Sequence, residues 1–376
     1  MIITKNFDLG RLDIGYYLVI GIWLLVIQKQ LVSNPALAGL KSIFFRAIHM
    51  TQEYLLSVEN LKTYFFTRSG VVKAVDGVTF SVHPGEALGI AGESGSGKSI
   101  TCLSLVRLVP QPAGRIVGGK ILFQGEDLLT KNEEEIRDLR GKTIAMILQD
   151  PLTSLNPVYT IGNQVGEAFK LSGDKKWKTI RQKVIDILNQ VKIPSAEQRL
   201  KDYPFQFSGG MRQRVLAATG IARKPKLLIA DEPTTSLDVT IQDQFLRLLK
   251  ELQRQTQMSL ILVTHDLGIV AETCDRVAVM YAGKIVEIGS VERVYQAPAH
   301  PYTNALMMAL PKLERKTRRL YQIEGEPPNL NELPSGCTFH PRCPSVMDIC
   351  QEEYPPEVPV SGGGTATCWL LVKRGA

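Results

Sequence analysis

Apolar residues along this chain fall into short continuous runs separated by polar turns, a pattern typical of buried strands. Such runs occupy residues 87–91, 143–148, 226–230 and 260–264. Between them, residues 178–191 have helical spacing, with apolar side chains at Ile180, Val184, Ile185, Ile187, Leu188 and Val191. Strands that alternate with helices predict an α/β fold, and we expect residues 55–150 and 220–293 to form its core around a doubly wound parallel sheet.

The segment before the first buried run has the alternating pattern of an edge strand. Residues 55–65 alternate between apolar and polar, a turn follows at Arg68-Ser69-Gly70, and residues 71–75 and 78–82 continue the pattern. The sequence His83-Pro84-Gly85-Glu86 then ends it. A β-region therefore precedes the central sheet.

The first 49 residues differ in pattern from the rest of the chain. Ile14 and Ile27 bound an uncharged apolar run, which as a helix would span about 21 Å against a hydrocarbon core of about 30 Å. Three interpretations remain: a short membrane-associated helix, a buried helix, or an extension absent from the working protein. Because a strand pattern starts just after Met50, we expect residues 1–54 to be an extension and the working polypeptide to begin near Met50.

The composition changes again after residue 293. Prolines recur throughout residues 294–376, so we expect a loop-rich segment, called here the C-terminal extension. Of the six cysteines, Cys102 and Cys274 lie in the predicted core, and the last forty residues hold the other four. This clustering favours a metal site in a reducing compartment over disulfides.

Length and charge set only broad limits. A chain of 376 residues is enough for about two domains. The net charge of +7 is spread along the sequence, and its densest basic runs, residues 175–178 and 315–319, are typical of solvated helix faces. Charge therefore gives no reason to predict nucleic-acid binding.

A glycine-rich motif lies between the apolar run at residues 87–91 and residues 100–106, which suit a helix. It reads Gly92-Glu93-Ser94-Gly95-Ser96-Gly97-Lys98-Ser99, the pattern of a phosphate-binding loop. Glycines let backbone N–H groups turn toward phosphate oxygens, and the helix N-terminus adds partial positive charge. We expect Lys98 to reach the β- and γ-phosphates and the Ser99 hydroxyl to bind Mg²⁺. This phosphate loop alone predicts only a nucleotide.

Polar side chains follow three of the other buried runs, where open α/β sheets place their ligands. Asp231 is expected to hold Mg²⁺, and the adjacent Glu232 to polarise an attacking water. Gln149 would place an amide near the metal and the water. His265 would contact the γ-phosphate from a third direction.

A second glycine-containing helix start lies at Ser208-Gly209-Gly210-Met211, called here the signature segment. Ser208 suits an N-cap and the glycines expose N–H groups. A second phosphate-facing helix end is redundant in one chain, so we expect it to complete the nucleotide site of a second copy. Asp238 would then lie at the same contact.

Residues 55–293 resemble the nucleotide-binding domain of ATP-binding-cassette (ABC) proteins. The resemblance rests on the order in which the motifs occur: the phosphate loop, Gln149, the signature segment, Asp231-Glu232, Asp238 and His265. Phe207 and Met211 replace the commoner leucine and glutamine. The resemblance implies a P-loop NTPase fold, a head-to-tail dimer that holds two ATP, and a helical insertion at about residues 151–219 that receives a coupling helix from a membrane partner. An aromatic about 25 residues before the loop would stack on adenine, and spacing does not choose among Tyr64, Phe65 and Phe66.

Three further segments, residues 153–157, 207–214 and 300–303, resemble the ATPase subunits of dipeptide, oligopeptide and nickel importers, as does the sequence Cys337-Thr338-Phe339-His340-Pro341-Arg342-Cys343-Pro344. The resemblance implies a peripheral ATPase on the cytoplasmic face of the cell membrane that powers import of peptides or nickel. Its partners would be a second ATPase subunit, identical or paralogous, two integral membrane permease subunits and an extracytoplasmic solute-binding protein, without nucleic acid. The alternative is a soluble ABC ATPase that acts on nucleic acid or ribosomes, but those usually carry two cassettes or a long coiled coil.

The spacing of Cys337, Cys343, Cys350 and Cys368 leaves three interpretations open: free thiols, a zinc site and an iron–sulfur cluster. Zinc sites favour closer pairs, whereas wider spacing suits a cluster. The family resemblance implies a [4Fe–4S] cluster, which we expect to be structural or redox-sensing, to cross-link the C-terminal extension, and to lie remote from the ATP chemistry.

Overall fold

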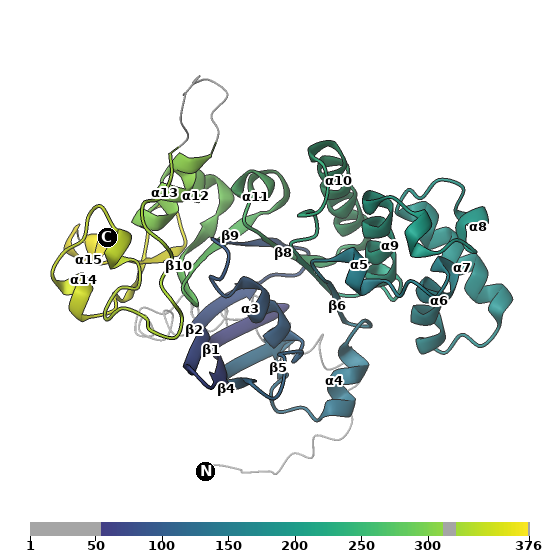
Figure 1. Ribbon diagram of the computed structural model, residues 1–376, viewed down its shortest axis with the longest axis horizontal. Helices are drawn as coiled ribbons and strands as arrows, with labels where there is room; N and C mark the ends of the chain where they lie inside the picture. The colour runs from purple at the N-terminus through teal and green to yellow at the C-terminus, as the bar shows by residue number, and fades with distance from the viewer. Residues whose placement is uncertain (1–53, 311–320, 375–376) are drawn as a thin grey trace, which may run out of the picture. The chain divides into compact units, whose positions relative to one another are not determined.

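The computed structural model describes residues 54–310 and 321–374 (Figure 1). The extension predicted at residues 1–54 lies almost wholly outside them. The described chain begins with an antiparallel sheet of order β2-β1-β4-β5. Its strands are β1 (Leu56–Thr67), β2 (Gly70–Val82), β4 (Gly114–Phe123) and β5 (Glu126–Asp127). The two runs expected at residues 71–75 and 78–82 are one continuous strand, because β1 pairs with both parts.

The second sheet contains the buried apolar runs and has the order β11-β12-β10-β9-β3-β8-β7-β6. Its parallel part consists of β3 (Ala87–Ala91), β6 (Ile144–Ile147), β7 (Leu227–Asp231), β8 (Ser259–Thr264) and β9 (Arg276–Tyr281). Its antiparallel part consists of β10 (Lys284–Ser290), β11 (Glu357–Pro359) and β12 (Thr365–Thr367). The mixed α/β fold predicted from the sequence is confirmed.

Both faces of the parallel strands are buried, which explains why those strands are continuously apolar. Successive residues point to opposite faces: Leu227 and Ile229 pack toward the first sheet, whereas Leu228 and Ala230 pack toward the helices on the other side. Two hydrophobic cores therefore hold the strands between them, and the polar residues at the strand ends are fixed in place.

Helices cover the sheet and form a separate lateral group (Figure 1). Near the sheets lie α3 (Lys98–Leu105), α4 (Glu133–Leu139), α9 (Gly209–Ile221), α10 (Val239–Thr256) and α11 (Leu267–Thr273). The lateral group contains α6 (Ile161–Leu171), α7 (Trp177–Gln190) and α8 (Ala196–Arg199), followed by the 3₁₀ turn η2 (Pro204–Gln206). The short helix α5 (Pro151–Ser154) lies between this group and the sheet, beside α9 (Figure 1). The helix predicted over residues 178–191 is α7, shifted by one residue.

The C-terminal extension has more regular structure than its prolines suggest. It contains α12 (Val291–Gln296, which starts just before it), α13 (Pro301–Ala309), η3 (His340–Arg342), α14 (Ile349–Glu352) and α15 (Trp369–Arg374). Strand β12 pairs with β10, and β11 adds to β12. The extension is thereby joined to the central sheet by strand pairing.

Among residues 54–310 and 321–374, no helix combines the length and apolar character that crossing a bilayer requires. The apolar run between Ile14 and Ile27 lies outside those residues.

Candidate nucleotide site

The phosphate loop joins the fully buried β3 to the N-terminus of α3. Two of its glycines have no room for a side chain. Gly92 has φ +152°, and a Cβ there would lie 2.2 Å from the Met280 carbonyl oxygen; Gly97 has φ +101°, and a Cβ would lie 2.2 Å from the Ala74 carbonyl oxygen. The close approach of β9 and β2 therefore requires glycine at both positions.

Lys98 and Ser99 turn back from the helix start toward the strand ends. The Lys98 ammonium donates hydrogen bonds to the carbonyl oxygens of Gly92 at 2.8 Å and Glu93 at 2.9 Å. The Ser99 hydroxyl donates to the Asp231 carboxylate at 3.0 Å. Burial raises the pKa of Asp231, and its hydrogen bond from Ser99 opposes that shift. Two oxygen groups that suit Mg²⁺ are thus adjacent.

The Glu232 carboxylate contacts side chains that follow the ends of three strands. Its carboxylate accepts hydrogen bonds from the Gln149 amide at 2.9 Å and the Thr235 hydroxyl at 3.1 Å, and it lies 3.6 Å from the His265 ring. Its backbone is in the left-handed region, with φ +43°, which costs a non-glycine residue energy and is often found at functional sites. The sequence pattern did not indicate Thr235.

A cavity of about 370 Å³ opens beside these groups. It is lined by Phe65, Val72, Ala74, Ser94, Gly95, Gly97, Lys98, Ser99, Ile100, Gln149, Glu232 and Leu330. Of the three candidate aromatics, only Phe65 lines it. The Tyr64 hydroxyl instead donates to Asp76 at 2.7 Å, and Phe66 is exposed with Arg115 over its ring.

The cavity fits a nucleotide. The phosphate loop and the start of α3 provide backbone N–H groups and a positive helix end. Lys98 and Ser99 also line the cavity and supply an ammonium group and a hydroxyl group. The residues present therefore fit a bound phosphate chain.

The signature segment lies outside this cavity lining. Ser208 accepts a hydrogen bond from the Met211 N–H at 3.3 Å and caps α9, as expected. Asp238 likewise caps α10, accepting from the Ile241 N–H at 3.0 Å. Ser208 and Gly209 are exposed. Within one described chain, the segment that was expected to bind nucleotide does not reach the phosphate loop's cavity.

The predicted [4Fe–4S] cluster is wrong. Within the described residues, which include all four tail cysteines, no group of three or more His, Cys, Asp or Glu side chains could hold a metal ion, so the zinc alternative has no support either. The four cysteines do line one cavity, but its volume is about 10 Å³, too little for more than one water.

The tail thiols instead behave as packing groups. Cys350 and Cys368 are buried, and Cys337 and Cys343 pack against the hydrophobic core. Burial raises the pKa of Cys337 to about 11 and also raises the pKa values of the Cys343 and Cys368 thiols. Wide sequence spacing did not distinguish packing cysteines from ligands.

Other residues of the C-terminal extension contact the phosphate loop. Arg342 of η3 forms a two-bond ion pair with the Glu93 carboxylate of the phosphate loop, at 2.8 and 3.1 Å. The Tyr302 hydroxyl of α13 accepts a hydrogen bond from the Glu93 N–H at 2.9 Å, and Leu330 lines the cavity itself. No sequence pattern indicated that these three side chains belong to the site.

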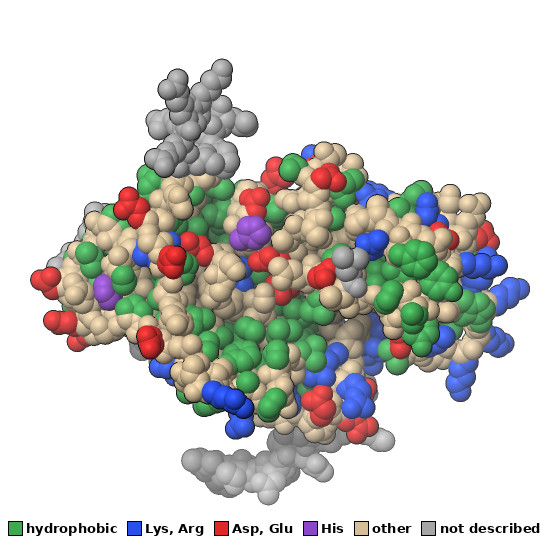
Figure 2. Space-filling model, viewed as in Figure 1, with side chains coloured by type: hydrophobic (Ala, Val, Ile, Leu, Met, Phe, Trp, Pro, Cys, Tyr) green, Lys and Arg blue, Asp and Glu red, His purple; other side chains and the backbone are tan. Residues whose placement is uncertain are grey.

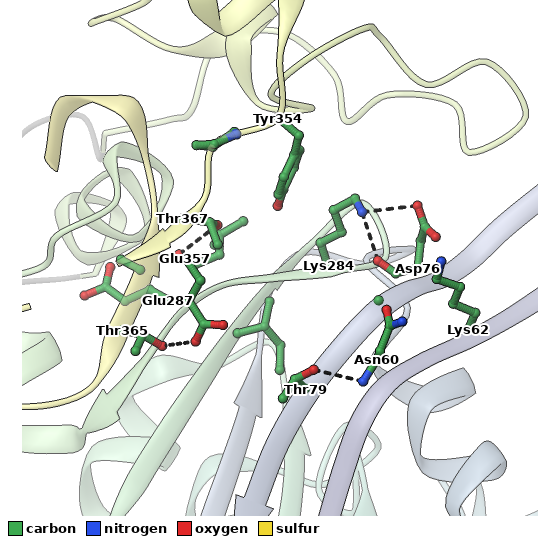
Figure 3. Close-up of a pocket in the computed structure, with 15 residues that line it drawn as sticks. Asn60, Lys62, Asp76, Thr79, Lys284, Glu287, Tyr354, Glu357, Thr365 and Thr367 are labelled. Carbon is green, nitrogen blue, oxygen red and sulfur yellow. Dashed lines mark hydrogen bonds and ion pairs between the residues drawn. The ribbon is translucent and has the colours of Figure 1, made fainter. Parts of the chain in front are cut away.

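A second cavity, of about 360 Å³, lies where the extension meets the first sheet (Figure 3). Lys284 points toward Asp76, 3.1 Å away, and its ammonium lies 4.7 Å from the centre of the Tyr354 ring. Glu357 on the opposite wall accepts from Thr365. With no glycine loop or helix N-terminus in its lining, this cavity lacks the features of a phosphate site.

Comparisons with known proteins agree with this geometry. Residues 75–235 match the family model described as ABC transporter, and residues 286–350 match the one described as oligopeptide/dipeptide transporter, C-terminal region. The chain is 48% identical over 322 residues to the dipeptide transport ATP-binding protein DppD of Bacillus subtilis (strain 168), covering 86% of this chain and 96% of that protein. The oligopeptide transport ATP-binding protein AppD of the same organism is 46% identical, with 86% and 98% covered.

Solved structures give the same fold. The ATP-binding cassette MJ0796, dimeric and bound to ADP and Pi, superimposes with a TM-score of 0.57 at 23% identity, covering 63% of this chain and 98% of that one. The protein cbiO1 from Clostridium perfringens gives a TM-score of 0.56 at 27% identity, with 65% and 92% covered. The P-loop fold is therefore that of an ABC cassette, and its ligand is ATP with Mg²⁺. This chain is an ATPase and belongs to the family of ABC transporter ATP-binding subunits that includes the dipeptide and oligopeptide transport proteins.

Proposed function

We propose that this chain hydrolyses ATP to power the import of peptides through a membrane ABC transporter. The observation that carries the proposal is the union, in one chain, of a complete phosphate-loop site with a C-terminal extension matching that of oligopeptide and dipeptide transporters. The first feature supports ATP chemistry, and the second supports the peptide class of cargo. Nickel, the other solute of the resembling importers, is a competing outcome of the test.

The hydrogen bonds at the ATP site support the following proposed roles. Lys98 and the phosphate-loop N–H groups bind the phosphates; Ser99, Asp231 and Gln149 hold Mg²⁺, which neutralises phosphate charge. Glu232 would polarise the attacking water, the Gln149 amide would lie near the metal and that water, and His265 would contact the γ-phosphate. Phe65 offers the aromatic face for adenine.

A second ATPase subunit completes each site in this proposal. Helix α9 begins at the signature segment, Ser208-Gly209-Gly210-Met211, and the first N–H groups of the helix have no i−4 partner, as at any helix start. Since they lie outside their own chain's cavity lining, they suit the γ-phosphate held by a partner. Asp238 would lie at the same contact.

The lateral helices offer a surface for the proposed permease subunits. Figure 2 shows hydrophobic side chains gathered over α6 and next to α9. Val158 is 73% exposed, Tyr159 55% and Phe205 69%. A backbone hydrogen bond from the Ile161 N–H to Asp202 joins the two segments that carry them. Exposed apolar side chains of this kind mark interaction sites, and we place the subunit, with its permease partners and solute-binding protein, peripherally at the cytoplasmic face of the membrane.

The test is reconstitution. The full chain is purified with the proteins that co-purify with it and placed in proteoliposomes with the associated solute-binding protein. ATP-dependent uptake of labelled dipeptides and longer peptides, lost in Lys98→Ala, is the expected result. Uptake of nickel alone would change the cargo, and co-purification with ribosomes or DNA in place of integral membrane subunits would overturn the proposal.

A further inference from the structure

We propose that Arg342 and Tyr302 of the C-terminal extension are positioning residues for ATP binding, acting through Glu93 of the phosphate loop. The inference rests on the nucleotide site proposed above and deepens it. It assigns the extension a part in the ATP site of its own chain, in addition to any role in peptide transport.

Glu93 is bonded at three points. The extension holds two of them: the Tyr302 hydroxyl accepts from its N–H at 2.9 Å, and the Arg342 guanidinium donates to both carboxylate oxygens, at 2.8 and 3.1 Å. The third is its carbonyl oxygen, which accepts from the Lys98 ammonium at 2.9 Å. The chain of contacts Arg342–Glu93–Lys98 thus runs from the extension to the side chain that is proposed to bind the phosphates.

These contacts are shielded from water. The Arg342 side chain is 4% exposed and the Glu93 side chain 26%, and Tyr302 is fully buried against Tyr281 and Phe339. The Arg342 guanidinium lies 5.8 Å from the centre of the Tyr281 ring and also donates to the Glu324 carbonyl oxygen at 3.1 Å. A bidentate, shielded arginine–carboxylate pair fixes geometry better than an exposed one.

The geometry explains why positioning is needed. With the extension removed, the Glu93 carboxylate and N–H would lose these partners, and the loop would gain freedom that ATP binding must then remove. Leu330 shows that the extension also reaches the cavity wall. The extension is therefore placed to limit the mobility of the loop's first turn before the nucleotide arrives.

The test is a double-mutant cycle on the full chain, with the Kd for MgATP measured by calorimetry. Glu93→Gln and Arg342→Gln are each expected to weaken MgATP binding about tenfold, the order of a hydrogen bond to a charged group. If Arg342 acts through Glu93, the double variant should be no weaker than either single variant. Arg342→Lys, which keeps the charge but not the planar fork, should give an intermediate Kd. Tyr302→Phe should weaken binding by a smaller factor.

Two measurements separate positioning from simple folding. In the assembled complex, KM for ATP should rise while kcat at saturating ATP stays within about twofold, because Glu232 and its neighbours are untouched. Arg276→Gln is the matched control: it breaks another shielded ion pair, to Glu86 at 3.0 Å, remote from the cavity, and should leave the Kd unchanged.

The inference would be overturned by unchanged MgATP affinity in both single variants. It would also be overturned if the Kd of the double variant rose by the product of the two single-variant fold-changes. If Arg342→Gln does not fold, Glu93→Gln and Arg342→Lys decide the question by the same criterion of an unchanged Kd. A wild-type chain that does not bind MgATP at all would instead contradict the proposed nucleotide site.

Discussion

The Glu232 carboxylate is held in position by neighbouring side chains. Gln149 and Thr235 donate hydrogen bonds to its carboxylate, and His265 lies 3.6 Å from it. These contacts come from the ends of β6, β7 and β8, which adjoin in the sheet. The parallel strand order thus brings together a carboxylate, an amide and an imidazole that are far apart in the sequence.

Glu232→Gln is expected to bind MgATP normally and to lose turnover by a factor of about 10² to 10⁴, the contribution of a positioned base. An amide keeps the shape of the side chain but cannot accept the proton of the attacking water. Single-turnover hydrolysis in the assembled complex measures the loss. Lys98→Ala is the contrasting variant, in which nucleotide binding itself should weaken. Near-normal turnover in Glu232→Gln would refute the role given to Glu232.

At the scale of elements, α13 shows how the extension is fixed beside the phosphate loop. His300 caps the helix, its Nδ1 accepting from the Tyr302 N–H at 3.0 Å. The backbone N–H of His300 donates to Glu287, which is paired with Arg293. Burial lowers the pKa of His300 to about 3, so the ring is neutral and can accept the hydrogen bond. The helix that carries Tyr302 is thus started by a buried, uncharged histidine.

This cap predicts a loss of stability in acid. The unfolded chain protonates His300 near pH 6.5, whereas the folded chain does not until about pH 3. The stabilisation is therefore complete above about pH 7 and declines as the pH falls through 6.5 toward 3, by about 2 kcal/mol at about pH 5. Urea unfolding of the wild type and His300→Asn at both pH values measures the difference.

Asparagine also caps helices but does not titrate. The wild type should lose about 2 kcal/mol more than His300→Asn on acidification, because all other titrating groups are shared. An equal pH dependence in the two proteins would show that His300 is not held neutral in the folded chain.

At the scale of the whole molecule, we propose that the described chain contains one half of each of two nucleotide sites. The phosphate loop lines a cavity, whereas the signature segment starts α9 outside the lining of that cavity. The proposed dimer joins one half from each subunit, so nucleotide binding and closure become separable properties.

The variant Gly209→Asp separates nucleotide binding from dimer closure. A Cβ at Gly209 would lie 3.6 Å from the Leu237 side chain, an ordinary contact, so the subunit should fold and bind MgATP with normal affinity. The new carboxylate would face the γ-phosphate across the dimer and should prevent ATP-driven closure by charge repulsion. Crosslinking of the assembled complex, in the Glu232→Gln background that retains ATP, reports closure.

Gly209→Ala is the control, since it adds the same Cβ without the charge and should still close. If Gly209→Asp crosslinks with ATP as efficiently as Gly209→Ala, then the signature segment does not act across the interface.

Local sequence was sufficient to predict structural positions that depend on consecutive residues. The phosphate loop and the signature segment lie at helix starts, and Asp231-Glu232 lies at a strand end, as the sequence predicts. The α/β class followed for the same reason, from buried apolar runs and helical spacing. The N-terminal 49 residues had no such pattern, and their prediction stays untested.

Tertiary structure alone decided the contacts between distant segments. Tyr64, Phe65 and Phe66 are equivalent by spacing, and only the pairing of β1 with β2 and β4 brings Phe65 to the cavity. Arg342 meets Glu93 across 249 positions, because β12 joins the sheet beside β10 and the extension folds back onto the phosphate loop. The tail cysteines became packed thiols by the same folding. Spacing along a chain fixes neighbours within an element, but partners across elements depend on how the sheet and its extension are assembled.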